Sequence, residues 1–224
     1  MDGILVVNKP QGMTSNDVVD LIRRRFDIKK VGHAGTLDPM ATGALVILIG
    51  KYTKSSSEFM GDDKEYQAEL TLGAVSDTLD AWGKVVSSGK EVNFKAHEIE
   101  AAFKKFLGNI EQTPPAYSAV KYKGKKLYEL ARKGISVKVE PRRIFIKDIE
   151  IQKIDLPKVK FKAACSKGTY IRRLASDIGN ELGCGAYLSG LERTRSGRFI
   201  VSDSVGMDAL RTISREDLAK RLIV

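Results

Sequence analysis

The sequence predicts an α+β fold with a mixed, largely antiparallel central sheet and flanking helices. Helical and strand-like hydrophobic patterns both occur, but they do not follow the regular alternation of a parallel βαβ protein. The chain has 224 residues, of which 42% are hydrophobic, and this composition can form a packed core. It contains no internal repeat and no low-complexity linker, so we expect one domain that spans residues 1–224.

Strand and helix signals follow one another closely at the start of the chain. Residues 4–7 form a short apolar run typical of a strand, and a helix follows for which Thr14 or Ser15 is the N-cap. Residues 32–39 contain several glycines and a proline without any periodicity, which predicts a loop. Residues 44–49 are continuously apolar and predict a strand that is buried on both faces.

The remainder of the chain contains the same two kinds of pattern. Residues 66–72 alternate between apolar and polar side chains, which places Tyr66 on the apolar side of a half-buried strand. An apolar stripe at helical spacing predicts a helix within residues 95–108. The other expected elements are strands at 143–151 and 159–164, a helix at 169–182 that ends at Gly183, and one or two short helices within 207–222.

The composition excludes several classes of protein. The longest apolar run, residues 44–49, is far too short to span a bilayer, and the first residues do not resemble a signal peptide. Two cysteines, Cys165 and Cys184, form neither a disulfide framework nor a recognisable metal site. We therefore expect a cytoplasmic protein, a monomer, that has no bound metal and no contact with a membrane.

Positive charge is concentrated in one stretch of the chain. The formal net charge is +10, and residues 114–147 contribute +8 of it through ten Lys and Arg side chains against Glu129 and Glu140. Tyr117, Tyr122 and Tyr128 are interleaved with these cations. Cations that alternate with aromatic rings suit phosphate contacts and base stacking, although a solvated basic face is the ordinary alternative.

Asp38 is the strongest candidate for a chemically active carboxylate. Glycines surround it in the 32–43 segment, and Pro39 disfavours the α conformation at Asp38 itself. The segment leads directly into the apolar strand, so a rigid element would hold the carboxylate in place, where it could act as nucleophile or base. An ordinary Asp-Pro turn, in which the side chain caps its own loop, explains the same residues.

Other candidates carry less information on their own. His33 shares the glycine-rich segment with Asp38 and could contact a base or a phosphate. Arg172 and Arg173 stand near the start of a predicted helix, where an arginine could pair with a buried carboxylate or a phosphate. Gly50-Lys51 is not a phosphate-binding loop, because Tyr52 follows where Ser or Thr is required. No serine or cysteine triad can be identified.

Taken together, these segments resemble the TruB family of tRNA pseudouridine-55 synthases. The motifs occur in the order typical of that family, from about Asn8 to about Arg198, and the twelve-residue loop around Asp38 is the most specific of them. The segments that carry the resemblance are residues 8–15, 32–43, 64–66, 114–119, 167–172 and 182–186, followed by Leu191.

The resemblance implies the pseudouridine synthase fold and a reaction that isomerises a uridine in the T-loop of tRNA without cofactor or metal. In this reaction uracil leaves the ribose through N1 and is reattached through C5, so nothing is oxidised and no group is donated. Because a base within the T-loop is stacked, it must be flipped out before any side chain can reach it.

The same resemblance implies roles for individual residues. Asp38 would be the nucleophile, and attack at C6 of the base or at C1′ of the ribose both remain open. Tyr66 would stack on the flipped base and is a candidate base for the C5 proton. Arg172, rather than Arg173, would pair with Asp38 and keep the carboxylate ionised. Together these make Asp38, Tyr66 and Arg172 the predicted catalytic residues.

Substrate binding is assigned in the same way. The resemblance implies that Leu191 forms a wall of the uracil pocket, that His33 fills the gap left by the flipped base, and that Lys9 and Pro10 support the active-site loop. The basic segment at about 114–147, with Tyr117 and Lys121 among its RNA contacts, would close over the T-stem-loop of tRNA.

Many family members continue into a small C-terminal RNA-binding (PUA) domain. We expect no such domain within residues 1–224 and therefore weaker contacts to the acceptor stem. Two other functions remain as alternatives, a guide-RNA-dependent synthase of the dyskerin branch and a non-catalytic tRNA chaperone. The expected lack of the PUA domain speaks against the first, and the presence of Asp38, Tyr66 and Arg172 speaks against the second.

Overall fold

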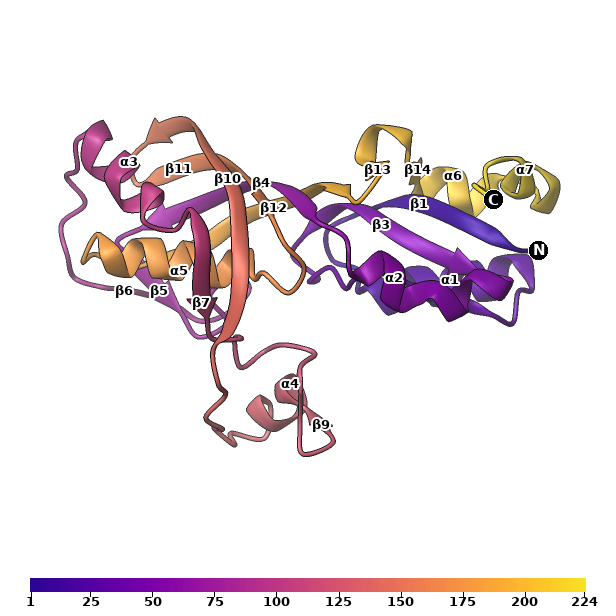
Figure 1. Cartoon of the computed structure of the whole chain (residues 1–224), viewed down its shortest axis with the longest axis horizontal. Helices are drawn as coiled ribbons and strands as arrows, with labels where there is room; N and C mark the ends of the chain where they lie inside the picture. The colour runs from indigo at the N-terminus through magenta and orange to yellow at the C-terminus, as the bar shows by residue number, and fades with distance from the viewer. The chain divides into compact units, whose positions relative to one another are not determined.

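A computed structural model describes residues 1–224 as a mixed α+β protein, and it divides into two compact units. Unit 1 comprises residues 1–67 and 191–224, and unit 2 comprises residues 68–190. Strands β4 (Lys64–Leu72) and β12 (Ala186–Ser196) pass from one unit into the other (Figure 1). Whether the two units act as the single catalytic domain expected from the sequence stays a prediction.

The sheet of unit 1 is built on the most apolar segment of the chain. Strand β3 (Thr42–Ile49) pairs antiparallel with β1 (Gly3–Lys9) along its whole length, and every residue of β3 after Thr42 is buried. The strand order in this unit is β14-β1-β3-β12, with parallel pairing of β1 to β14 (Val205–Gly206) and of β3 to β12. Strands β2 (Val31–His33) and β13 (Phe199–Ile200) add antiparallel pairs at β3 and β12.

The sequence predicted the start of the first helix of unit 1 and the short helices near the C-terminus, but not the short helices over residues 50–60 and 201–203. Helix α1 (Ser15–Phe26) has Thr14 as N-cap in a capping box with Asp17, and it buries Val18, Ile22 and Phe26. At its far end Arg25 donates to the carbonyls of Arg211 and Ile213, at the end of α6 (Met207–Thr212). The remaining helices of this unit are η1 (Gly50–Ser55), α2 (Ser56–Met60), η2 (Val201–Asp203) and α7 (Arg215–Lys220).

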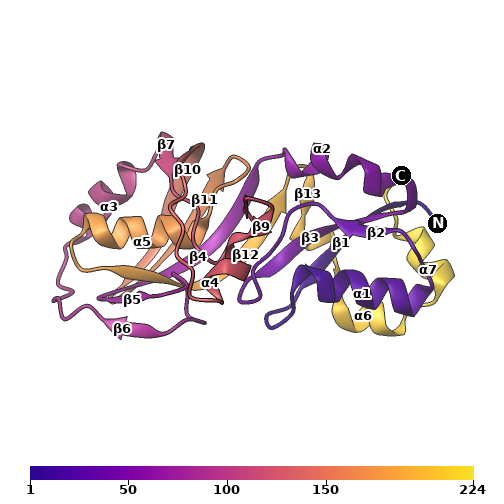
Figure 2. The ribbon, with the colours of Figure 1, turned by 90° about the horizontal axis from the view of Figure 1, so that it is seen from below.

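Unit 2 contains a largely antiparallel sheet and two smaller hairpins. The strand order of the sheet is β12-β4-β11-β10-β7, in which β10 (Arg142–Asp155) pairs antiparallel with both β11 (Lys158–Cys165) and β7 (Gly108–Gln112). One hairpin joins β5 (Ala74–Ser76) to β6 (Val85–Ser87), and in both ribbon views it lies beside α5 (Ile171–Glu181) (Figures 1 and 2). The other joins β8 (Lys121–Tyr122) to β9 (Lys125–Lys126).

Helices α3 (Ala96–Lys104) and α5 complete the core of unit 2. Phe103 of α3 packs edge-on against Phe161 of β11, with ring centroids 5.2 Å apart. Helix α5 approaches the backbone at Ala186 so closely that a Cβ on Gly179 would lie 2.2 Å from the Ala186 nitrogen. Glycine is therefore required at this position. A short helix, α4 (Leu127–Ala131), follows β9.

The predicted fold class, a mixed and largely antiparallel sheet with flanking helices, is confirmed. Several details differ from the sequence prediction, which also did not include the short elements η1, α2, α4 and β5 to β9. Residues 32 and 33 belong to strand β2 instead of a loop, because their backbone pairs with β3. The helix expected over residues 95–108 ends at Lys104, and strand β12 was not expected at all. No helix combines the length and the apolar character that crossing a membrane requires.

Candidate active site and RNA-binding segment

The loop that carries Asp38 connects β2 to β3 in unit 1, and its backbone is tied down on both sides of that residue. The Leu37 N–H donates to Ser15 Oγ at 2.9 Å, and this hydroxyl donates back to the Leu37 carbonyl at 3.2 Å. On the other side, the Gly12 N–H donates to the Pro39 carbonyl at 2.9 Å. Asp38 itself is half-buried. The carboxylate therefore sits on a fixed backbone, as the sequence predicted for a residue anchored by the following strand.

Arg193 of β12 holds the two ends of this loop together. Its side chain is only 1% exposed, and it donates from Nε to the Ala44 carbonyl at 2.8 Å and from Nη2 to the Gly35 carbonyl at 3.1 Å. Gly43 lies so close to the Arg193 backbone that a Cβ would come within 2.3 Å of the Arg193 carbonyl oxygen, and its φ is +102°. Only glycine can occupy that position. Sequence reasoning missed Arg193, because nothing local marks it.

Lys9 is a second buried cation beside the loop. Its Nζ donates to the Met13 carbonyl at 2.7 Å and to the Pro10 carbonyl at 2.9 Å, and the residue is fully buried. Burial lowers the pKa of Lys9 to about 8; the nearby Asp38 charge opposes this shift, and Arg193 adds to it. Lys9 thus orders the turn that contains Pro10. The support of the active-site loop expected from Lys9 and Pro10 stays a prediction.

His33 lies at the end of β2, opposite Ile47 of β3, and is half-buried. Its Nδ1 is buried and makes no hydrogen bond. Burial lowers the pKa of His33, and the positive charge of Arg193 lowers it further, so the ring is neutral at pH 7. A neutral ring can stack between bases without the free-energy cost of removing a charge from water.

Tyr66 and Leu191 also belong to unit 1. Tyr66 lies on β4 in phase with the buried residues Ala68, Leu70 and Leu72, and it is half-buried, which confirms the predicted face of the strand. Leu191 lies on β12 and is likewise half-buried. Their contacts with a bound base stay predictions.

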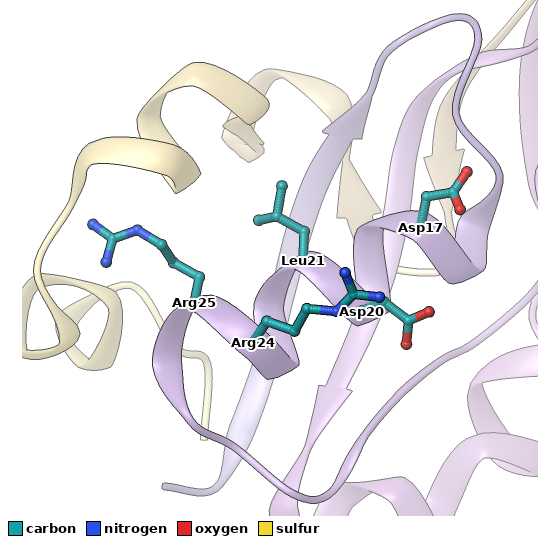
Figure 3. Close-up of a pocket in the computed structure, with 5 residues that line it drawn as sticks. All are labelled: Asp17, Asp20, Leu21, Arg24 and Arg25. Carbon is teal, nitrogen blue, oxygen red and sulfur yellow. The ribbon is translucent and has the colours of Figure 1, made fainter.

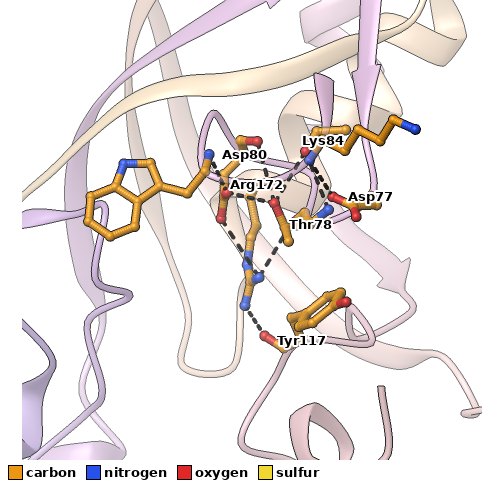
Figure 4. A network of polar contacts seen from close by, with 8 residues as sticks. Asp77, Thr78, Asp80, Lys84, Tyr117 and Arg172 are labelled. Atoms are coloured by element: carbon orange, nitrogen blue, oxygen red, sulfur yellow. Dashed lines mark hydrogen bonds and ion pairs between the residues drawn. The ribbon is translucent and has the colours of Figure 1, made fainter. Parts of the chain in front are cut away.

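Arg172 is the centre of a buried polar network in unit 2 (Figure 4). From the first turn of α5, where it is 4% exposed, it donates to the Tyr117 carbonyl at 2.5 Å and to the Thr78 carbonyl at 3.3 Å. Its guanidinium also lies 3.9 Å from the carboxylate of Asp80. The neighbouring Arg173 instead pairs with Asp177 at 2.8 Å and remains partly exposed. The structure thus separates two arginines that the sequence alone could not distinguish.

Asp80 was not identified from the sequence. It is 5% exposed, and its Oδ1 accepts from Thr78 Oγ1 at 2.7 Å and from the Trp82 N–H at 3.0 Å. Its proximity to Arg172 joins residues far apart in the chain, so only the fold reveals it. The one local signal was the dense run of turn-forming polar residues around Thr78.

The basic segment, residues 114–147, leaves the sheet of unit 2 after β7 and returns to it in β10. Nine of its ten cations are exposed, Lys126 is half-buried, and none forms an ion pair with a carboxylate. Lys123 lies over the Tyr122 ring, while Lys126 and Arg132 lie over the Tyr128 ring. Lys121 on β8 is exposed, and Tyr117 is half-buried. These cations are available to phosphates.

A shallow groove on α1 contains none of the predicted site residues. Figure 3 shows its lining, which projects from one helix. The lining is of mixed charge and consists of Asp17, Asp20, Leu21, Arg24 and Arg25. Elsewhere, no group of three or more His, Cys, Asp or Glu side chains is placed to hold a metal ion, and both cysteines are buried without forming a disulfide.

Comparison with known proteins identifies the family to which these elements belong. Residues 23–171 match the family model described as TruB family pseudouridylate synthase (N terminal domain). Residues 172–223 match the model described as tRNA pseudouridylate synthase B C-terminal domain. The boundary between the two matches falls at Arg172, within the first turn of α5.

Curated relatives carry one shared name, tRNA pseudouridine synthase B. The protein from Opitutus terrae is 46% identical over 223 residues, which are 100% of this chain and 92% of that relative. The protein from Clostridium novyi is 51% identical over 217 residues, or 97% of this chain and 75% of that relative.

Two solved structures have a similar fold over most of this chain. A chain in the crystal structure of a Cbf5-Nop10-Gar1 complex is 30% identical, with a TM-score of 0.73 over 92% of this chain, although the match covers only 52% of that chain. A structure of an H/ACA RNP bound to a substrate RNA containing 2′-deoxyuridine gives 28% identity and a TM-score of 0.69, and the match covers 51% of that chain. On the two family matches and these relatives, the chain belongs to the TruB family of pseudouridylate synthases.

Proposed function

We propose that this protein isomerises the uridine at position 55, in the T-loop of tRNA, to pseudouridine. The observation that carries the proposal is the fixed loop that presents Asp38, because it supplies a carboxylate on a preorganised backbone within a family of pseudouridylate synthases. The names of the relatives, which specify tRNA, favour this substrate. We expect the protein to work as a monomer in the cytoplasm.

The reaction exchanges one bond of the ribose for another. The N1–C1′ bond of uridine breaks, the detached uracil rotates, and a C5–C1′ bond forms. The C5 proton is then lost and N1 regains a proton, so that the product is an isomer of the substrate. No electron acceptor or group donor is needed, in agreement with a proposal that includes neither cofactor nor metal.

Asp38 is the proposed nucleophile, with attack at C6 or at C1′ both compatible with the reaction. Tyr66 is proposed to stack on the uracil and to accept the C5 proton. The proposed pairing of Arg172 with Asp38 joins residues of the two units and stays a prediction. What supports Arg172 is its burial and its fixed orientation by three polar groups of unit 2.

Binding residues complete the proposal. Leu191 forms a wall of the uracil pocket, and His33, as a neutral ring, fills the space left by the flipped base. Flipping costs a few kcal/mol, which contacts to the RNA backbone must offset. The accessible cations of the basic segment, Lys121 among them, are suited to supply those contacts. Tyr117 links that segment to the Arg172 network through its carbonyl.

The test is incubation with unmodified tRNA that carries tritium at C5 of uridine, followed by mapping of pseudouridine in the product. We expect tritium release and modification at the T-loop uridine alone. Binding of tRNA without any release would support the chaperone alternative. The second candidate is the guide-RNA-dependent enzyme, since a matched structure is that of a multi-protein complex. The protein is therefore tested alone. Release that requires a guide RNA and accessory proteins would support that branch instead.

A further inference from the structure

Trp82 is the only tryptophan of the chain, and its side chain lies open to solvent. It belongs to the turn between β5 and β6, and the residue is 52% exposed. Val75, Val85 and Val86 of the same hairpin are 43%, 40% and 49% exposed. A large aromatic ring at such a position loses the stabilisation of burial, and exposed aromatic surface of this kind marks interaction sites.

The turn that presents Trp82 is held rigidly. Three of its backbone N–H groups donate hydrogen bonds. That of Ala81 donates to the Leu188 carbonyl at 2.9 Å, and that of Trp82 to Asp80 Oδ1 at 3.0 Å. The Lys84 N–H donates to Asp77 Oδ1 at 2.8 Å. A Cβ on Gly83 would lie 2.2 Å from Asp77 Oδ1, so the turn has no spare room. The indole is therefore displayed by a fixed backbone, which lowers the entropy lost when it binds a partner.

The same turn is part of the Arg172 network. Asp80 accepts from the Trp82 N–H and lies within ion-pair distance of Arg172, while Figure 4 shows Thr78, Asp80 and Tyr117 around the Arg172 guanidinium. The exposed Trp82 is thus two residues away in the chain from Asp80, whose carboxylate lies 3.9 Å from the guanidinium of Arg172. Next to it, Lys84 is exposed and adds a cation, with the exposed carboxylate of Asp77 nearby.

We propose that Trp82 is an RNA-binding residue, whose indole stacks on an unpaired nucleobase of the substrate. This inference rests on the proposed function, since it takes Arg172 to mark the place where the RNA is bound. Single-stranded RNA is recognised by stacking of splayed bases on aromatic side chains. Lys84, on the same turn, is exposed and adds a positive charge to this part of the surface. Stacking requires no hydrogen bond at the base, so it adds affinity with little sequence preference.

The test uses the fluorescence of Trp82 itself. An unmodified T-arm stem-loop RNA is titrated into the wild-type protein, and we expect quenching that saturates with the Kd obtained from an independent binding assay. Trp82→Ala should bind the RNA about 5- to 150-fold more weakly, the range for loss of one stacked base. Trp82→Phe should retain most of the affinity, because the phenyl ring can still stack.

Leu107→Ala is the matched control, since Leu107 is 42% exposed in the same unit and lies outside the basic segment. It should bind as the wild type does. Unchanged fluorescence at saturating RNA would overturn the inference, and so would wild-type affinity of Trp82→Ala for the RNA. A fluorescence change that follows protein concentration instead of RNA would also overturn it, by assigning Trp82 to an interface between copies of the protein.

Tritium release measured in the same samples separates the two proposals. Release without quenching removes Trp82 from the RNA-binding surface and leaves the proposed function intact. Quenching without release leaves the stacking residue in place and removes the proposed activity.

Discussion

Two regions of this molecule use cations in opposite ways. Around the Asp38 loop of unit 1, Lys9, Lys64 and Arg193 are all less than 8% exposed, and each donates to backbone carbonyls. In the basic segment of unit 2, nearly all cations are exposed and none pairs with a carboxylate. The buried and the exposed cations contribute equally to the net charge, although the first lie in the protein interior and the second in solvent.

The difference shows what burial does to a charged side chain. A buried cation loses its water shell and is stable only when its donors are satisfied, so it fixes the backbone groups to which it donates. An exposed cation keeps its water and its mobility, and it remains available for a phosphate. We infer that the first region orders the catalytic loop and that the second region provides affinity for RNA.

The largest effect is expected at Asp38, whose loop is bound by the buried side chain of Arg193. Asp38→Asn preserves the size of the side chain but removes the nucleophile, so turnover should fall by more than about a thousandfold. Tritium release from labelled tRNA measures this directly. Substantial residual release would remove Asp38 from the nucleophile role.

Arg193→Ala should be the most destabilising change among the cations. It leaves the carbonyls of Gly35 and Ala44 without their buried donor, and breaking such an interaction costs about 3 to 5 kcal/mol. Urea unfolding gives the free energy of unfolding.

Arg195→Ala is the control for this change, because Arg195 lies on the same strand but pairs with Glu65 at the surface. Its loss should change the stability by about 1 kcal/mol or less. Equal effects of the two substitutions would contradict the role assigned to Arg193.

Lys9 predicts a pH dependence of stability. Its pKa in the folded protein, about 8, lies below its ordinary value of 10.5, so the unfolded chain binds the proton more tightly. The free energy of unfolding should therefore rise as the pH increases from about 8 to 10.5, by about 3 kcal/mol in total. Lys9→Met should lack this rise. Parallel stability curves for the two proteins across this window would show that burial does not penalise the Lys9 charge.

The smallest effect on any single property is expected in the basic segment. Lys121→Ala or Arg142→Ala should weaken tRNA binding and reduce its logarithmic salt dependence by roughly one unit per lost phosphate contact. Stability should remain as in the wild type, because both side chains are exposed. A salt dependence identical to that of the wild type would place these residues away from the RNA.

Local patterns were sufficient to predict much of the fold. The N-cap at Thr14 or Ser15, the buried strand β3 and the alternation in β4 are visible in a few neighbouring residues. The structure confirms the strand and the alternation and selects Thr14 as the N-cap. The basic segment could be found by counting charges, because exposure is the usual state of Lys and Arg.

The features that could not be predicted from the sequence depend on contacts between segments that are far apart in the chain. The sequence does not distinguish Arg193 from the other polar residues of its strand, because its burial depends on the pairing of β12 with β3. The role of Asp80 likewise depends on α5, which places Arg172 beside it. Residues 32–33 contain breakers and become a strand only because β3 offers a partner. Local propensity carries no information on such pairings.

The most direct test measures binding and chemistry separately in two variants. Asp38→Asn and the double variant Lys121→Ala/Arg142→Ala are compared with the wild type for the Kd of tRNA and for the single-turnover rate of tritium release at saturating protein. We expect Asp38→Asn to bind with nearly wild-type Kd and to release no tritium, and the double variant to bind more weakly and to release tritium at the wild-type rate. Loss of binding in Asp38→Asn, or a slow saturated rate in the double variant, would contradict the separation of the two regions.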